Sequence, residues 1–119
     1  MRYLIVAGGR NFSDYVLAYE QIHQCVQSID DEVAIVSGGA KGADTMGEAY
    51  ALLYDLPLIR YLAKWGEHGR AAGPIRNSEM AEIGTDLLAF WDGQSRGTKD
   101  MITKAKSKGM AVTIVYYED

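Results

Sequence analysis

The chain has 119 residues, of which 48% are hydrophobic, and a formal net charge of −4. This length fits one compact domain, residues 1–119, and the apolar fraction is too high for a disordered segment. The negative balance argues against a dedicated nucleic-acid-binding protein, which usually carries a basic face.

The N-terminal apolar run, Met1 to Ala7, is too short for a signal peptide, and no run approaches the roughly 20 residues that cross a bilayer. We therefore expect a cytoplasmic protein without a membrane partner. The single cysteine, Cys25, rules out an internal disulfide. Two histidines and one cysteine, far apart in the chain, have no metal-ligand spacing, so we expect neither a metal nor a cofactor.

Strand and helix patterns alternate along the chain. Short apolar runs predict strands, and apolar residues at helical spacing predict helices. The expected strands are residues 2–7, 33–36, 58–62, 86–91 and 111–116, and the expected helices are 15–29, 45–54, 75–83 and 98–108. Such alternation predicts an α/β fold, specifically a Rossmann-like three-layer sandwich around a mainly parallel five-stranded sheet. Right-handed crossovers favour the strand order 3-2-1-4-5.

Details of these elements carry further expectations. Tyr15, Tyr19, Ile22, Val26 and Ile29 fall on one stripe of the first helix. Ser13 or Asp14 is expected to cap that helix, and His23, off the stripe, to be solvated. Residues 63–73 are expected to form a loop that is long for a small domain, and such loops are often functional. Pro74 then starts the third helix.

Three glycine-containing turns follow strands one, two and four. They are Gly8-Gly9-Arg10, Ser37-Gly38-Gly39-Ala40-Lys41-Gly42 and Asp92-Gly93. In a parallel sheet all three lie beyond the carboxyl edge, where α/β proteins bind ligands. Glycines allow the backbone N–H groups to approach a ligand, and the helix that follows adds unpaired N–H groups and the positive end of its dipole. The pattern predicts a phosphate or nucleotide site.

We assign roles by residue type. Gly38, Gly39, Ala40 and Gly42 are expected to present N–H groups to a phosphate, with the Ser37 hydroxyl in support. Lys41 is either a phosphate partner or a solvated charge. Asp44 either accepts ribose hydroxyls or favours its helix dipole.

Other candidates lie beside the remaining turns. Arg76 is expected to hold phosphate, unless it forms a surface ion pair. Ser95, Gly97 and Thr98 open the last helix and form a second anion cradle. Trp65, on the long loop, is the candidate for base stacking. Trp91 is assigned to the core, and Tyr116 and Tyr117 to structural roles.

Standard motifs are absent. Residues 38–43 do not match G-x-G-x-x-G, and Lys41 precedes glycine rather than Ser or Thr, which makes a P-loop a poor fit. No G-x-S-x-G is present.

Four segments nevertheless resemble the YspA/YpsA-related branch of the SLOG superfamily. They are Gly8-Gly9-Arg10-Asn11-Phe12, residues 37–44, Ala72-Gly73-Pro74-Ile75-Arg76-Asn77 with Met80, and Trp91-Asp92-Gly93 with Ser95, Gly97 and Thr98. The resemblance implies a Rossmann-like domain that binds a nucleotide or nucleotide-derived ligand, often as a homo-oligomer. Its relatives include Lonely Guy phosphoribohydrolases, DNA-processing protein A and ligand sensors in bacterial defence, so phage-related signalling is a further implication.

The chain departs from the Lonely Guy pattern P-G-G-x-G-T-x-x-E at its catalytic glutamate. Met101 occupies that position, and Asp100, one residue earlier, is expected to point about 100° away. The R-K-x-x-M frame survives as Arg76, Asn77 and Met80. If the protein is an enzyme, Arg76 with Asp92 or Glu79 would have to supply the chemistry.

These observations leave three hypotheses. The first is a module that binds a nucleotide-derived ligand for sensing or sequestration. The second is a nucleoside 5′-monophosphate phosphoribohydrolase. The third is a DNA-processing accessory, which the net charge disfavours because it makes nucleic acid an unlikely partner.

Overall fold

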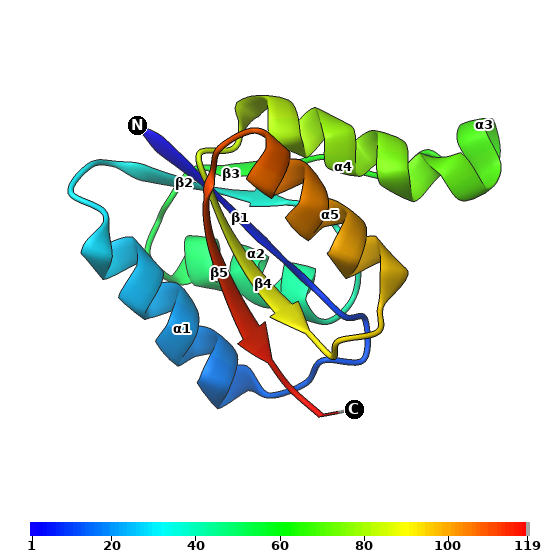
Figure 1. The fold of residues 1–119 in the computed structure, drawn as a ribbon. Coiled ribbons are helices and arrows are strands. Elements are labelled where there is room, and N and C mark those ends of the chain that lie inside the picture. The colour runs from blue at the N-terminus through cyan, green and yellow to red at the C-terminus, as the bar shows by residue number, and fades with distance from the viewer. Residues whose placement is uncertain (119) are drawn as a thin grey trace.

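The computed structural model describes residues 1–118. Five strands form one sheet in the order β3-β2-β1-β4-β5, and every neighbouring pair is parallel (Figure 1). This is the predicted Rossmann-like α/β architecture, with the predicted strand order. The strands are β1 (Arg2–Gly8), β2 (Val33–Ser37), β3 (Leu58–Arg60), β4 (Asp86–Trp91) and β5 (Ala111–Tyr116).

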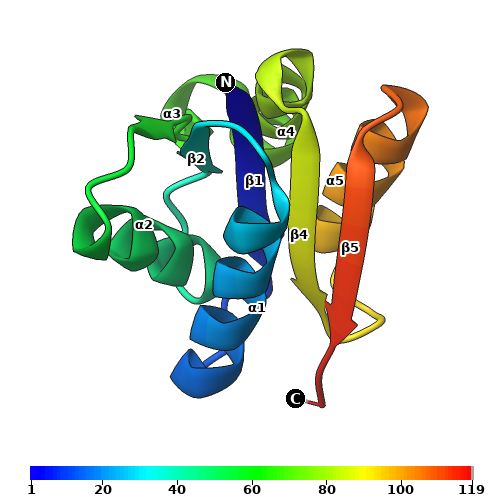
Figure 2. The same ribbon diagram turned by 90° about the vertical axis from the view of Figure 1, so that its left-hand side faces the viewer.

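Helices cover both faces of the sheet (Figures 1 and 2). One face carries α1 (Tyr15–Ser28) and α2 (Ala43–Leu53), and the other carries α4 (Ala72–Ile83) and α5 (Arg96–Ser107). Successive side chains of β1 alternate between the two faces of the sheet. Leu4 and Val6 pack toward α1 and α2, whereas Ile5 and Ala7 pack toward α4 and α5. Among residues 1–118, no helix is long and apolar enough to cross a lipid bilayer.

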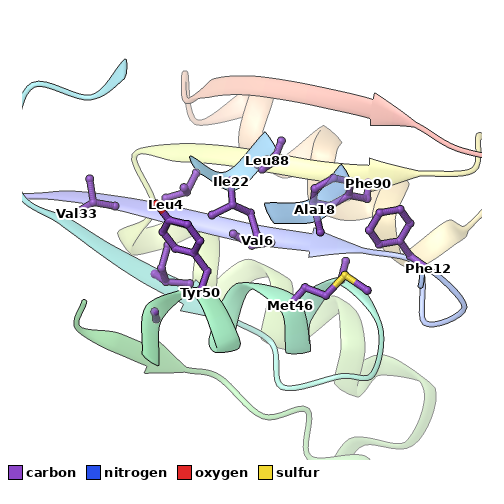
Figure 3. Packing of buried hydrophobic residues seen from close by; sticks show 13 residues of the cluster. Leu4, Val6, Phe12, Ala18, Ile22, Val33, Met46, Tyr50, Leu88 and Phe90 are labelled. Carbon is purple, nitrogen blue, oxygen red and sulfur yellow. The ribbon is translucent and has the colours of Figure 1, made fainter. Parts of the chain in front are cut away.

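The core on the α1/α2 face closes around aromatic side chains (Figure 3). Phe12, from the loop after β1, stacks on Phe90 of β4 with ring centroids 4.6 Å apart. Tyr117, just beyond β5, lies 4.7 Å from the same Phe12 ring. These contacts fasten the β1 loop to the ends of β4 and β5, where the candidate site lies.

Helix α1 begins as predicted, and Ile22, Val26 and Ile29 of the predicted stripe pack in or against the core. The Asp14 carboxylate accepts a hydrogen bond from the Leu17 N–H at 3.1 Å, so Asp14 is the N-cap. Ala18 and Ile22 are buried, but Tyr15 is 72% exposed, so its assignment to the inward stripe was wrong. Tyr15 occupies the first helical position, where α1 extends beyond the sheet that would cover it.

The expectation that His23 is a solvated residue was also wrong. Its Nδ1 lies 2.8 Å from the Tyr50 hydroxyl, and its ring stacks on Tyr19 and Tyr54. The aromatic residues of α2 that receive His23 are distant in sequence, so the periodicity of α1 alone did not reveal them.

Residues 63–73 are more ordered than a loop. They contain α3 (Trp65–His68) and a 3₁₀ turn, Gly69–Ala71, and α4 already begins at Ala72. Pro74 is therefore the third residue of α4, still in the first turn, where a missing N–H costs nothing. Figure 1 shows α3 projecting beyond the end of α4, away from the sheet.

Candidate functional site

A cavity of about 710 Å³ opens at the carboxyl edge of the sheet. Its walls come from the loop after β1, α3 and the 3₁₀ turn, the start of α4, the β4–α5 turn and the segment after β5. Of the predicted ligand-binding residues, it brings together Gly8, Gly9, Arg10, Ala40, Asp44, Trp65, Arg76, Asn77, Asp92, Ser95, Gly97 and Thr98. This volume suits a nucleotide-sized ligand.

The loop after β1 presses against the start of α2. Gly42, at φ +78°, is so close to the loop that a Cβ there would lie 2.3 Å from the Gly9 carbonyl oxygen. That oxygen accepts hydrogen bonds from the Phe12 N–H at 3.2 Å and the Ala43 N–H at 3.4 Å. The first two turns therefore converge at one edge, as the sequence predicted, but Gly42 serves backbone packing and does not line the cavity.

The N–H groups of the second turn are directed at the protein itself. The Gly39 N–H donates to the Ser37 Oγ at 3.0 Å, and the Ala40 N–H donates to the Asp44 Oδ2 at 3.2 Å. Ser37 is fully buried and donates to a Glu48 carboxylate oxygen at 2.6 Å. The carboxylate of Asp44 thus takes the place that was predicted for a ligand phosphate. Three other residues of this turn, Gly38, Gly39 and Lys41, lie outside the cavity lining, and Lys41 is exposed.

Asp44 and Arg76 face each other beside this turn. Burial raises the pKa of Asp44 to about 6, against hydrogen bonding from the Ala40 N–H and the charge of Arg76, which lower it. Arg76 donates from Nη1 to the Gly38 carbonyl at 2.7 Å and from Nε to the Asn77 Oδ1 at 3.0 Å. Burial lowers the pKa of Arg76, attraction to Asp44 opposes this, and repulsion from Arg10 adds to it.

The start of α5 offers the N–H groups that the second turn does not. Arg96, Gly97 and Thr98 form the first turn of α5, where N–H groups have no intrahelical acceptor, and all three line the cavity. The Asp92 Oδ1 accepts from the N–H groups of Gln94 at 2.9 Å and Ser95 at 2.8 Å, which fixes the turn that leads into the helix. Those hydrogen bonds lower the pKa of Asp92, so it stays ionised.

Four arginines line the cavity: Arg10, Arg70, Arg76 and Arg96. None of them forms an ion pair with a carboxylate in residues 1–118. The three carboxylates of the lining are already engaged, because Asp44 and Asp92 accept backbone N–H groups and Asp100 pairs with Lys104. The lining thus carries four arginines against three aspartates, one of which pairs with Lys104, and this positive balance favours an anion.

Trp65 lies at the cavity with half of its surface exposed. The Arg10 guanidinium sits 5.6 Å from its ring centroid, in cation–π geometry. A base that stacks on Trp65 would use the ring's other face or displace Arg10.

Asp100 and Met101 depart from expectation together. Met101 is 1% exposed and packs in the α4/α5 core, yet it also borders the cavity. Asp100 does not point away: it lines the cavity, and its Oδ2 accepts from Asn77 Nδ2 at 3.0 Å and Lys104 Nζ at 2.9 Å. The prediction that Asp100 points away was therefore wrong, because the cavity borders both positions. Glu79 lies on the exposed side of α4 and outside the lining.

Sequence reasoning missed several lining residues. Tyr117 was assigned a purely structural role, but it borders the cavity and its hydroxyl packs against Gly9, where a Cβ would collide with it. Arg70 and Arg96 flank predicted elements. The signal that could have identified them as site residues was a positive charge within a glycine-containing segment. Gly93, at φ +84°, is exposed and lies outside the lining.

The fold and this cavity define a Rossmann-like α/β protein with a basic site at the carboxyl edge of its sheet. The sequence profile of the YspA, cpYpsA-related SLOG family matches residues 2–68, more than half of the chain, and the chain belongs to this family. It is 30% identical over 118 residues to the gene 61 protein of Mycobacterium phage D29, covering 94% of each chain.

Among solved structures, the fold is similar to that of DNA processing protein A (DprA) from Streptococcus pneumoniae. The TM-score is 0.72 at 20% identity over 95% of this chain, which spans 49% of that protein. At this identity the likeness concerns the fold.

Proposed function

We propose that the cavity binds a nucleotide or nucleotide-derived ligand, for sensing or sequestration. The observation that carries this proposal is the set of four cavity arginines without carboxylate partners, gathered around the first turn of α5. Membership of the SLOG family supports a nucleotide-related ligand. The relative that is 30% identical is a phage protein, and the proposal accordingly includes a phage-related role.

The expected chemistry divides the cavity into two ends. A phosphate accepts hydrogen bonds from the N–H groups of Gly97 and Thr98 and from the Arg96 guanidinium, which together match its charge and its several acceptor oxygens. A base packs near Trp65, whose exposed ring offers apolar surface at the cavity rim.

The test is isothermal titration of the protein with AMP, GMP, CMP and UMP at low salt. We expect saturable binding by at least one of them, and weaker binding to Arg96→Gln. The matched control is Lys106→Gln, an exposed residue of α5 outside the cavity, which removes the same charge. No binding by any nucleotide, or equal loss in both variants, would refute the proposal.

A second candidate is phosphoribohydrolysis, because two of the three carboxylates that line the cavity, Asp92 and Asp100, have an oxygen available to a substrate. In each of them one carboxylate oxygen accepts the protein hydrogen bonds and the other has no partner in residues 1–118. A free carboxylate oxygen is what the cleavage of a glycosidic bond requires. Chromatography of nucleoside monophosphates after incubation with the protein tests this activity. Base release that disappears in Asp92→Asn or Asp100→Asn would support it, and no release would dismiss it.

Self-association is a further proposal, which the family resemblance first suggested. Large apolar side chains are exposed on α1 and at the end of α2, including Val16 at 69% and Leu53 at 67%. Sedimentation equilibrium of the wild type and of Val16→Glu/Leu53→Glu tests it. A monomeric wild type would refute it.

A further inference from the structure

Two of the cavity arginines stand close enough to repel each other. Arg10 and Arg76 both line the cavity, and the charge of Arg10 contributes to lowering the pKa of Arg76. Neither forms an ion pair in residues 1–118. Asp44 supplies one counter-charge beside Arg76, so the two guanidinium groups carry more positive charge than this carboxylate balances, and a bound anion would lower their electrostatic energy.

Contacts with neighbouring residues hold both guanidinium groups in position. Arg76 is anchored by the Gly38 carbonyl and the Asn77 side chain, which use Nη1 and Nε and leave Nη2 without an acceptor among residues 1–118. Arg10 rests against the Trp65 ring. Such preorganisation reduces the side-chain entropy lost when an anion binds.

Arg10 and Arg76 belong to different elements from the residues proposed to bind a phosphate at the start of α5. Arg10 follows β1 and Arg76 belongs to α4, whereas Arg96 and its N–H neighbours belong to α5. Both groups border the same cavity of about 710 Å³. One monophosphate at the start of α5 would leave the Arg10–Arg76 pair with the Asp44 carboxylate but without a ligand phosphate of its own.

We propose that the site is built for a ligand with two phosphates, a nucleoside diphosphate or a compound with the same pyrophosphate, in which Arg10 and Arg76 bind the second phosphate. This inference rests on the proposed function and adds the number of anionic groups. The pair is part of the binding site, and its role is to select diphosphates over monophosphates.

The experiment compares, for each base, the affinities of the nucleoside monophosphate and diphosphate in EDTA, so that no metal ion neutralises the phosphates. We expect the diphosphate to bind about tenfold tighter, or about 1.4 kcal/mol. Arg10→Gln and Arg76→Gln should bring the ratio of the two affinities close to one. Arg96→Gln should weaken both ligands by a similar factor and keep the ratio.

The outcomes separate this inference from the proposed function. Equal affinities for mono- and diphosphates in the wild type overturn the inference and leave nucleotide binding intact, whereas no binding of either ligand overturns both. Arg10 is exposed, so Arg10→Gln is expected to fold even if the half-buried Arg76→Gln does not. The last ligand to be tested is a 5′-phosphorylated dinucleotide. If it binds tighter than the diphosphate, the site recognises a nucleic-acid backbone and the inference fails.

Discussion

The contact between the β1 loop and the start of α2 can be tested with one methyl group. We predict that Gly42→Ala destabilises the protein by about 3 kcal/mol. An alanine at φ +78° and ψ −125°, a region open almost only to glycine, costs about 1–3 kcal/mol. Its Cβ would lie 2.3 Å from the Gly9 carbonyl oxygen, which must move and weaken two backbone hydrogen bonds, each worth about 1 kcal/mol. The lower entropy of the unfolded alanine chain offsets about 0.5 kcal/mol.

Two other glycines of the same edge separate these contributions. Gly93 has φ +84° but open space around its Cα, so Gly93→Ala isolates the conformational cost and should lose about 1 kcal/mol. Gly97 has open space and no positive φ, so Gly97→Ala should change stability by less than about 0.5 kcal/mol.

Urea unfolding followed by circular dichroism gives the three free-energy differences at a common slope. For a chain of this size, about 3 kcal/mol also lowers the melting temperature by roughly 10 °C. If Gly42→Ala were no less stable than Gly93→Ala, the close approach of Gly42 to the Gly9 carbonyl would not exist as described, and the alignment of the first two turns would need another explanation.

Three further predictions concern the site. Folding raises the pKa of Asp44 from 3.8 to about 6, so the folded state holds this proton more tightly than the unfolded state. The stability of the wild type relative to Asp44→Asn is therefore highest below pH 4 and should fall by about 3 kcal/mol as the pH rises to 7. A stability difference in urea unfolding that does not change with pH would contradict this. Met101→Glu buries a carboxylate in the α4/α5 core, so it should lower the melting temperature sharply and should not create base-release activity. Met101→Leu should lower the stability by less than about 1.5 kcal/mol. A stable Met101→Glu variant that releases base would show that the position faces the ligand. In a Trp91→Phe background, where Trp65 is the remaining tryptophan, addition of a binding nucleotide should change the fluorescence emission, and an unchanged spectrum at saturation would place the base elsewhere.

Much of the architecture could be predicted from local patterns. Residues 33–36 and 87–91 are continuous apolar runs because their strands are covered on both faces, and that burial can be predicted from sequence. Strict alternation with helices then requires parallel pairing, and the handedness of the crossovers leaves few strand orders. The β4 and β5 boundaries agree with the prediction, and every other boundary agrees or differs by one or two residues except the start of α4, which differs by three.

The candidate site was less accessible to such reasoning. The glycines of residues 37–42 indicated a turn with available N–H groups, but the same sequence also contains Asp44, which accepts one of them. Whether a turn binds its own carboxylate or a ligand depends on distances that composition does not contain. The start of α5 has no side-chain cap on its N–H groups, and its first residues line the cavity.

The sequence alone determined the α/β class, the strand order and the edge of the sheet at which glycine turns gather, because these follow from periodicity along neighbouring residues. Only the tertiary structure decided which charges remain without a partner. Arg10 meets Trp65, Arg76 meets the Gly38 carbonyl, and Tyr117 meets Gly9, each across a long stretch of chain. The physical reason is that hydrogen bonding and charge compensation are short-range in space, whereas the residues that supply them are distant in sequence.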